Sequence, residues 1–200
     1  MRECKEVHVP FEFKSLDIIG LVLILPRVFA DERGFFLETY KRSDLRRVLI
    51  DDHFVQGNLS HSVKGVLRGL HFQKQPRAQG KLVQVLQGEI YDVVLDIRRD
   101  SPSFGRWEGV TLSEADKALL YVPPWCAHGF CALSNSALVS YQVTDEFSPE
   151  HERGILWSDP ALAITWPVTG AIISDKDGSW PLFADADLDQ HWNAPLPKRF

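Results

Sequence analysis

The fold class is decided by one apolar segment, Lys81-Leu82-Val83-Gln84-Val85-Leu86-Gln87-Gly88-Glu89-Ile90-Tyr91-Asp92-Val93-Val94-Leu95-Asp96-Ile97. Two apolar runs flank Gln87-Gly88, where glycine permits the positive φ of a tight turn, so the segment predicts a β-hairpin. Side chains alternate between the two faces of a strand. In the second run, the residues expected on one face are Tyr91, Val93, Leu95 and Ile97. We therefore expect antiparallel β structure here.

Similar short runs recur along the chain between Gly, Pro, Asp and Ser residues. The expected strands are residues 21–25, 34–40, 55–62, 66–72, 81–86, 89–97, 106–112, 118–122, 128–132 and 137–145. Their regular spacing predicts an all-β sandwich or barrel. Helix is scarce: residues 43–49, with Ser43 as N-cap, predict one short surface helix. The tail after Pro167 predicts one or two more short helices, packed over the mouth of the sandwich.

Composition is that of one globular domain, with 200 residues of which 44% are hydrophobic and 24% charged. We expect residues 1–15 to form an N-terminal extension, 16–167 the core and 168–200 a helical or irregular tail. The net charge of −5 argues against a nucleic-acid partner, which needs a basic patch. Three cysteines without disulfide or CxxC spacing favour a cytoplasmic protein. We expect no membrane span and no signal peptide, because apolar runs are short and the N-terminus is charged.

His71 is the first candidate for chemistry, near the end of Gly65-Val66-Leu67-Arg68-Gly69-Leu70-His71-Phe72-Gln73. A free imidazole titrates near neutral pH and therefore suits a general base, but a buried, hydrogen-bonded histidine fits the pattern equally well. Arg68 lies three residues earlier, on the opposite face of a regular strand. Both side chains can enter one site only if the strand bulges, and Gly69 is where a bulge would be tolerated.

Lys81 and Tyr141 both fall on the apolar face of an expected strand. The Lys81 amine is therefore placed to stabilise an oxyanion, or it extends to solvent from the start of the strand. Tyr141 is either a proton donor or a core tyrosine with a satisfied hydroxyl. Asp177 is typical of a turn or cap residue, and nothing local connects it to His71.

His128 and Arg33 also have two interpretations each. His128 follows the turn Pro123-Pro124 and either lines a cavity or is simply buried, and Arg33 is typical of a turn charge. Metal-binding β-barrels typically use His-x-His plus a carboxylate, and position 73 is Gln, so we expect no metal. A Ser/His/Asp hydrolase is not supported either, because the sequence contains no GxSxG motif. A nucleotide would be held by side chains, because P-loop and GxGxxG motifs are missing.

Seven ordered motifs between Ile18 and Pro181 resemble the dTDP-4-dehydrorhamnose 3,5-epimerase family of metal-free, cupin-class enzymes. The motifs are Asp31-Glu32-Arg33-Gly34-Phe35-Phe36-Leu37-Glu38, Val55-Gln56-Gly57-Asn58, Gly65 to Gln73 as quoted above, Gly80-Lys81-Leu82-Val83, Ala127-His128-Gly129-Phe130, Glu150-His151-Glu152-Arg153-Gly154-Ile155 and Ser174-Asp175-Lys176-Asp177. The resemblance implies a jelly-roll β-sandwich with a few short helices, mainly near the C-terminus. It also implies a homodimer that exchanges N-terminal strand contacts, a dTDP-4-keto-6-deoxyhexose substrate and no cofactor.

The resemblance further implies roles for particular residues. His71 is the expected base at C3″ or C5″ of the sugar, with Asp177 orienting its ring. Tyr141 would return a proton on the opposite face, and Lys81 would stabilise the enolate oxygen, whose charge must be balanced as it develops. The expected substrate-binding residues are Arg33 of the partner subunit, Phe36, Glu38, Gln56, Asn58, Arg68, His128, Phe147 and Glu152. The two arginines would meet the diphosphate, and the two phenylalanines would flank the thymine.

Three positions differ from the family pattern. Phe147 stands where tyrosine is usual, Gln142 stands where lysine is common, and Trp125-Cys126 replaces Gly-Phe and would place an indole near the pocket. The alternatives are a mono-epimerase acting at C3″ or C5″ alone and a cupin that binds a sugar nucleotide without turnover. A His71→Ala change separates enzyme from binding protein, since only the rate should be lost.

Overall fold

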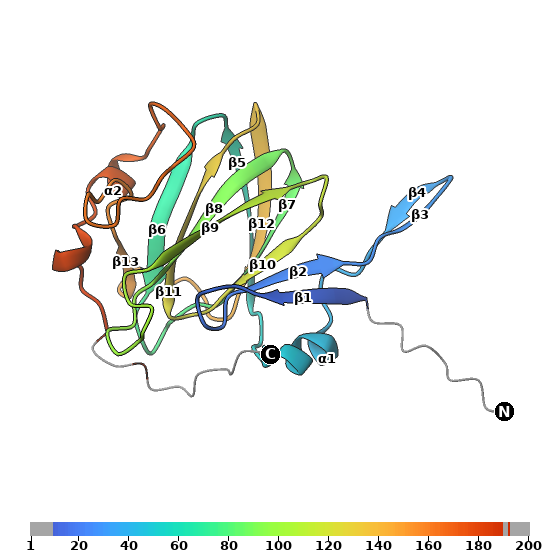
Figure 1. Ribbon diagram of the computed structural model, residues 1–200, viewed down its shortest axis with the longest axis horizontal. Helices are drawn as coiled ribbons and strands as arrows, with labels where there is room; N and C mark the ends of the chain where they lie inside the picture. The colour runs from blue at the N-terminus through green and yellow to red at the C-terminus, as the bar shows by residue number, and fades with distance from the viewer. Residues whose placement is uncertain (1–9, 190–191, 193–200) are drawn as a thin grey trace.

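Two antiparallel sheets form a β-sandwich, and a two-stranded hairpin projects from one side of it (Figure 1). The computed structural model describes residues 10–189 and 192. The strands are β1 (Phe11–Ser15), β2 (Val22–Pro26), β3 (Phe29–Asp31), β4 (Gly34–Phe36), β5 (Gln56–Val63), β6 (Leu67–Gln73), β7 (Lys81–Gln87), β8 (Glu89–Asp96), β9 (Trp107–Ser113), β10 (Leu119–Val122), β11 (Cys126–Ala132), β12 (Ser136–Val143) and β13 (Glu152–Gly154). The helices are α1 (Arg42–Leu45), η1 (Arg46–Val48), α2 (Asp175–Gly178) and η2 (Phe183–Asp185). The expected all-β class, with a few short helices, is confirmed.

The first sheet has the strand order β1-β2-β10-β7-β12-β5, and the second has the order β13-β6-β11-β8-β9. Between them packs an apolar core that includes Val83, Val94, Leu120 and Val139. A second cluster, with Val93 as a member, packs on the outer face of β8 beneath the C-terminal segment. Both faces of β8 are therefore buried, which explains its nearly continuous apolar sequence. Each fully buried aliphatic side chain stabilises the fold by about 1.5 to 3 kcal/mol.

The prediction of a hairpin at Gln87-Gly88 is wrong, because β7 and β8 belong to different sheets. Gly88 has φ +80°, and a Cβ at this position would lie 2.1 Å from the Ser136 carbonyl oxygen. Glycine here lets the chain turn a corner from one sheet to the other. Because β8 is apolar on both faces, both faces must be covered. The crossover at Gly88 places β8 in the second sheet, so that the first sheet covers one of its faces. The expected face of alternate residues is confirmed: Tyr91, Val93, Leu95 and Ile97 all pack beneath the C-terminal segment.

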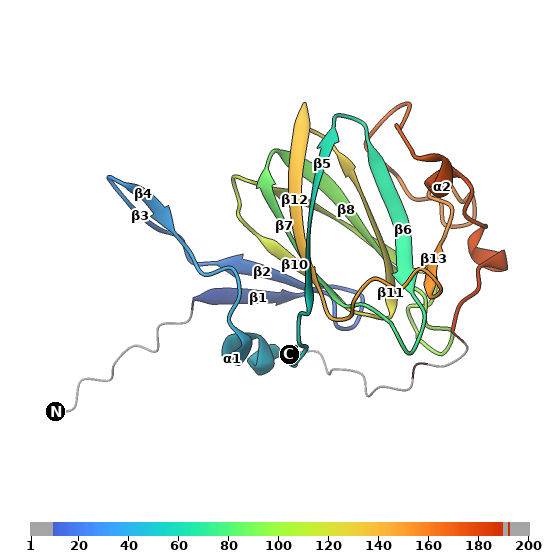
Figure 2. The same ribbon diagram turned by 180° about the vertical axis from the view of Figure 1, so that it is seen from behind.

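Several secondary-structure elements differ from expectation, most of them in the N-terminal third of the chain. The strand expected over residues 34–40 is limited to β4, which pairs with β3, and the short strands β1, β3 and β13 were not predicted. The expected helix is split into α1 and η1, and its N-cap is Lys41 rather than Ser43, with no side-chain capping bond. Figure 2 shows α1 beside β1 and β2, and Leu45 and Phe11 both belong to a third buried apolar cluster. Tertiary packing, rather than a capping residue, determines where this helix begins.

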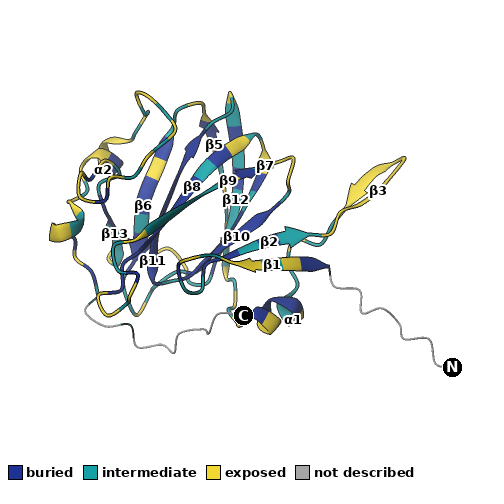
Figure 3. Cartoon of the chain, in the orientation of Figure 1, coloured by how far each residue is buried: buried dark blue, intermediate teal, exposed yellow. Residues whose placement is uncertain are grey.

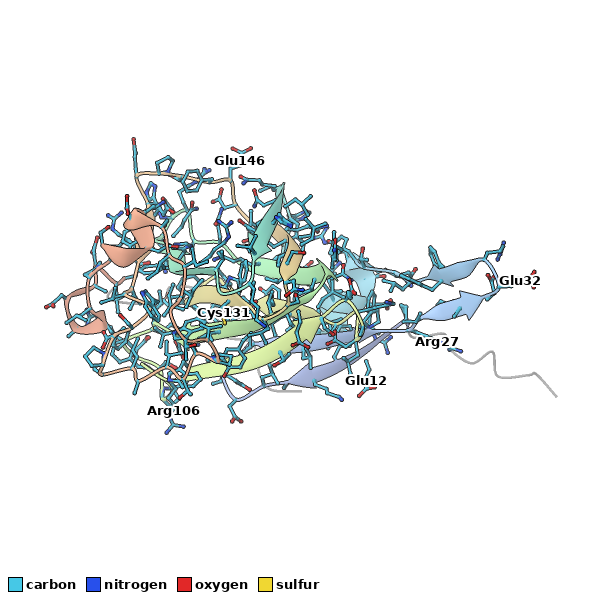
Figure 4. All side chains as sticks on the ribbon, turned by 90° about the horizontal axis from the view of Figure 1, so that it is seen from above. Glu12, Arg27, Glu32, Arg106, Cys131 and Glu146 are labelled. Carbon is cyan, nitrogen blue, oxygen red and sulfur yellow. The ribbon has the colours of Figure 1, made fainter. Side chains whose placement is uncertain are left out.

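The β3–β4 hairpin extends away from the sandwich and is exposed along its length (Figure 3). Glu32 marks its tip, whereas Cys131 lies inside the sandwich (Figure 4). The side chains of Phe35 and Phe36 are 61% and 66% exposed. Exposed aromatic side chains in such a group are typical of an interaction surface.

Part of the expected N-terminal extension is ordinary sheet, because β1 pairs with β2 in the first sheet. Residues 1–9 of that extension, and residues 190–191 and 193–200 of the expected tail, lie outside the described residues. In the part of the chain that is described, no helix is long and apolar enough to cross a membrane.

Candidate active site

A cavity of about 330 Å³, open to solvent, lies at one end of the sandwich between strands of both sheets and the α2 segment. Its lining residues are Ser60, Arg68, His71, Lys81, His128, Gly129, Phe130, Tyr141, Glu152, Ser174, Lys176 and Asp177. The four expected catalytic residues are all among them. They come from positions far apart in the sequence, so the fold alone brings them together.

His71 and Asp177 form a hydrogen-bonded pair, with 2.6 Å between His71 Nε2 and Asp177 Oδ1. Asp177 lies in α2, and the preceding segment is attached to the start of β6, where the Leu67 N–H donates to the Ile172 carbonyl at 2.9 Å. Ser174 caps α2 by accepting a hydrogen bond from the Asp177 N–H. Asp177 is therefore not itself the cap residue: Ser174 has that role, and Asp177 lies within the helix, paired with His71.

The Asp177 carboxyl is 7% exposed and ionised. Burial acts to raise the pKa of Asp177, but the hydrogen bond and charge of His71 and the Gly69 N–H outweigh it and lower that pKa. An ionised carboxylate beside the imidazole orients the ring and stabilises the imidazolium that forms when the ring accepts a proton.

Lys81 begins β7 and points into the cavity rather than to solvent. It is 7% exposed, and its Nζ donates to the His71 carbonyl at 3.2 Å. Burial lowers the pKa of Lys81 to about 8, with Asp92 partly opposing the shift. The interpretation of Lys81 as a solvent-exposed residue at a strand start is wrong. Its ammonium is a buried cation next to the His71 backbone.

Tyr141 lies on β12, between β5 and β7, with Asn58 and Val83 as its neighbours in the sheet. Burial raises the pKa of Tyr141, although Arg68 opposes the shift. The phenol is therefore protonated at neutral pH. Within the described residues its hydroxyl has no hydrogen-bond partner, so it is free to donate to a molecule in the cavity.

His128 lines the cavity beside His71, its direct neighbour in the β6–β11 pair. Its Nε2 lies 2.8 and 2.9 Å from the two carboxylate oxygens of the buried Asp92. Burial lowers the pKa of His128, with Asp92 opposing. The ring is therefore neutral, and its hydrogen bond to Asp92 holds it in one orientation.

Arg68 and His71 reach the same cavity because β6 is irregular between them. The pairing of β6 with β11 shifts register between His128 and Phe130, opposite Gly69, which has φ +131°. A Cβ on Gly69 would lie 2.5 Å from a backbone atom of β11. Glycine at position 69 thus permits the irregularity that brings the Arg68 guanidinium to the same side of β6 as the His71 imidazole. Arg68 Nε donates to Ser62 Oγ at 3.1 Å.

A sequence model described as dTDP-4-dehydrorhamnose 3,5-epimerase matches residues 15–185. This chain belongs to that epimerase family. It is 48% identical over 172 residues to the dTDP-4-dehydrorhamnose 3,5-epimerase of Shigella flexneri, covering 86% of this chain and 95% of that protein. The crystal structure of dTDP-6-deoxy-D-glucose-3,5-epimerase from Legionella pneumophila, in complex with dTDP-4-keto-L-rhamnose, has a TM-score of 0.87 and 44% identity, covering 92% of this chain and all of that one. The Bacillus anthracis enzyme, with TDP and PPi bound, has a TM-score of 0.84 and 47% identity, over 86% and 99% of the two chains.

The mouth of the cavity carries several residues expected to bind the substrate of an epimerase of this family. Glu152 accepts a hydrogen bond from Lys176 Nζ at 2.6 Å, and both line the cavity. Gln56 Nε2 donates to Asn58 Oδ1 at 2.8 Å, and Gln56 Oε1 accepts from the Phe147 N–H at 2.9 Å. These bonds join Gln56, Asn58 and the half-exposed Phe147 to one another; none of the three lines the cavity, but Asn58 pairs with the lining residue Tyr141 in the sheet.

Three expected binding residues lie outside the cavity of their own chain. Arg33 and Phe36 belong to the projecting hairpin, and Glu38 follows it. The Arg33 side chain is 84% exposed and pairs with Asp31 at 2.5 Å. Within one chain, Arg33 is therefore the turn charge that its local sequence indicates.

Trp125 does not place its indole near the cavity, so that expectation is wrong. It is buried in the core between the sheets, where its ring packs 5.3 Å from Trp192 and lies under the Arg98 guanidinium. Its Nε1 donates to the Ile19 carbonyl at 3.3 Å. Trp125 lies in the turn before β11, so strand alternation does not set its direction, and its indole packs in the core between the sheets together with Cys126 and Phe130.

The structure adds cavity residues that the sequence analysis missed. Lys176 lies inside a quoted motif but was not assigned a role, and Ser60 shares the face of Asn58 by simple alternation. The motif that contains Lys176 and the alternation that relates Ser60 to Asn58 are both visible in the sequence. Among the described residues, no group of three or more His, Cys, Asp or Glu side chains is arranged to hold a metal.

Proposed function

We propose that this protein epimerises a dTDP-4-keto-6-deoxyhexose at C3″ and C5″ by removing and returning protons through an enolate. The observation that carries the proposal is one cavity lined by a His71–Asp177 pair, a buried lysine and a protonated tyrosine. The names of the relatives and the sugar nucleotide bound in the Legionella structure support the same substrate class.

His71 is the base in this proposal. The ring nitrogen that is not bound to Asp177 accepts the proton from the carbon beside the ketone, and Asp177 balances the resulting imidazolium. The electron pair of the broken C–H bond moves to the C4″ oxygen as an enolate. Lys81 is the nearest buried cation for that oxygen, and an ammonium held away from water stabilises such a charge strongly.

Tyr141 is the acid in this proposal. Its phenol is protonated and donates to the carbon on the face opposite the base, which inverts the centre and restores the ketone. His71 then releases the proton that it removed to solvent, and the tyrosine recovers a proton from solvent, so both residues return to their starting states. The ketone already present in the substrate supplies the acidity, so the reaction needs no redox cofactor.

The remaining binding roles follow from charge and position. Arg68, with its forked donors, suits the diphosphate, and Glu152, Gln56 and Asn58 suit the nucleoside. We propose that the projecting hairpin reaches a second copy of the chain in a homodimer. Arg33, Phe36 and Glu38 would then complete the site of the partner, with Phe36 and Phe147 against the thymine. The buried free thiols Cys126 and Cys131 suit a reducing cytoplasm.

The test is proton exchange followed by NMR, with dTDP-4-keto-6-deoxyglucose in D₂O. Deuterium at both C3″ and C5″ supports double epimerisation, and deuterium at one position indicates a mono-epimerase. His71→Ala should lower the rate by at least about 100-fold while keeping the affinity for the nucleotide. Tight binding without exchange in the wild-type protein would indicate a binding protein and contradict the proposal.

A further inference from the structure

Trp180 lies directly beside the His71–Asp177 pair, although it is not among the residues that line the cavity. Its ring is 6.3 Å from the His71 ring, centroid to centroid, in an edge-on arrangement at 69°. It follows α2 in the chain, three residues after Asp177. The indole therefore contacts the catalytic pair from outside the cavity.

The backbone of β13 is shaped to receive this indole. Gly154 is the residue that pairs with His71 in the β6–β13 ladder. A Cβ on Gly154 would lie 2.4 Å from Cδ2 and Cε2 of Trp180, so only glycine leaves room for the ring. The Leu156 N–H donates to the Pro181 carbonyl at 2.8 Å and holds the following residue in place. The position of Trp180 is thus fixed by backbone on two sides.

The indole that packs against His71 carries a buried donor, its N–H group. Trp180 Nε1 is buried, and in the described part of the chain it makes no regular hydrogen bond. The pKa of Asp177, which burial acts to raise, is lowered by His71, by the Gly69 N–H and also by this indole N–H. A buried donor that acts on an ionised carboxylate stabilises its charge, and the ring beside His71 restricts the space available to the pair.

We propose that Trp180 is a positioning residue that holds Asp177 and His71 in the alignment needed for proton abstraction. The proposal rests on the epimerase function proposed above. Because Trp180 does not line the cavity, it acts through the pair and makes no contact with the sugar. Its removal should therefore lower kcat and leave KM nearly unchanged.

The first test compares Trp180→Phe with the wild-type protein. Phenylalanine keeps an aromatic ring and removes the N–H, so kcat should fall about three- to tenfold, as expected when a buried donor that acts on a charged group is lost without loss of a full hydrogen bond. KM should stay within about twofold. The control is Trp166→Phe, which changes a tryptophan that packs on Tyr91 outside the site, and it should keep wild-type kcat. An unchanged kcat, or a raised KM at unchanged kcat, in Trp180→Phe would overturn the proposal.

Two further measurements make the result independent of folding and of the proposed function. Gly154→Ala keeps Trp180 but displaces its ring, and it should reproduce the loss in kcat. The ¹⁵N NMR signals of the His71 ring report the pair directly without substrate, and both variants should shift them. Unshifted signals in both would overturn the role of Trp180. Absence of wild-type turnover, with shifted signals in the variants, would contradict only the epimerase function.

Discussion

Replacing Lys81 with methionine should make the protein more stable while abolishing its proposed activity. The amine is 7% exposed, and burial lowers its pKa from 10.5 to about 8. A lysine whose folded pKa lies below its unfolded value destabilises the fold at every pH below the folded pKa. Methionine has a similar length and carries no charge, so it removes this penalty.

The size of the effect follows from the two pKa values. Their difference corresponds to about 3 kcal/mol at pH 7. The variant also loses the hydrogen bond from Lys81 Nζ to the His71 carbonyl, which contributes about 1 kcal/mol. The net gain in the free energy of unfolding should be about 2 kcal/mol, or about 1 M in the urea midpoint.

The pH dependence provides the sharper check. Between pH 8 and 10.5 the unfolded wild-type chain binds a proton that the folded chain does not, so wild-type stability rises with pH over this window. The advantage of Lys81→Met should therefore shrink by about 2 kcal/mol between pH 7 and 9.5. Urea unfolding at both pH values measures it, with the exposed Lys64→Met as a control that should change stability by less than about 0.5 kcal/mol. A variant no more stable than wild type at pH 7, or a gain independent of pH, would refute the reasoning.

Two further predictions concern the reaction itself. Since Lys81 loses its charge as the pH rises through about 8, kcat should fall on the alkaline side with a midpoint near that value; a profile flat to pH 10 would exclude its ammonium from the rate-limiting step. Tyr141→Phe should lower inversion by about 100-fold or more while His71 still exchanges substrate protons with D₂O, because only the acid is removed. Loss of exchange and inversion together would contradict the division of roles.

The strands of the core were predictable because each shows an alternating or continuous apolar run of ordinary length. Their pairing was not, as the segment around Gly88 demonstrates. A glycine between two apolar runs is compatible with a hairpin and with a corner between sheets. The choice depends on which residues cover the second face of β8, and those come from the C-terminal segment, over 60 residues downstream.

The candidate site was predictable residue by residue only where a family pattern was available. Local rules assign Asp177 to a turn or cap, whereas in the structure Ser174 is the cap and Asp177 lies within the helix. Its contact with His71 depends on the attachment of Ile172 to the start of β6, which no local pattern encodes. Trp125 illustrates the opposite error, since nearness in sequence to His128 suggested nearness to the cavity, whereas the turn before β11 places the indole in the core between the sheets.

The arrangement of the two sheets suits a reaction that needs groups on both faces of one carbon. His71 and His128 lie on β6 and β11 of the second sheet, whereas Lys81 and Tyr141 lie on β7 and β12 of the first. A sugar ring held between the sheets would therefore meet His71, the proposed base, on one face and Tyr141, the proposed acid, on the other. A single sheet would present both groups to the same face and return the proton where it was removed. The sandwich thus provides the geometric condition for inversion, and the register irregularity at Gly69 adds Arg68 to the same space.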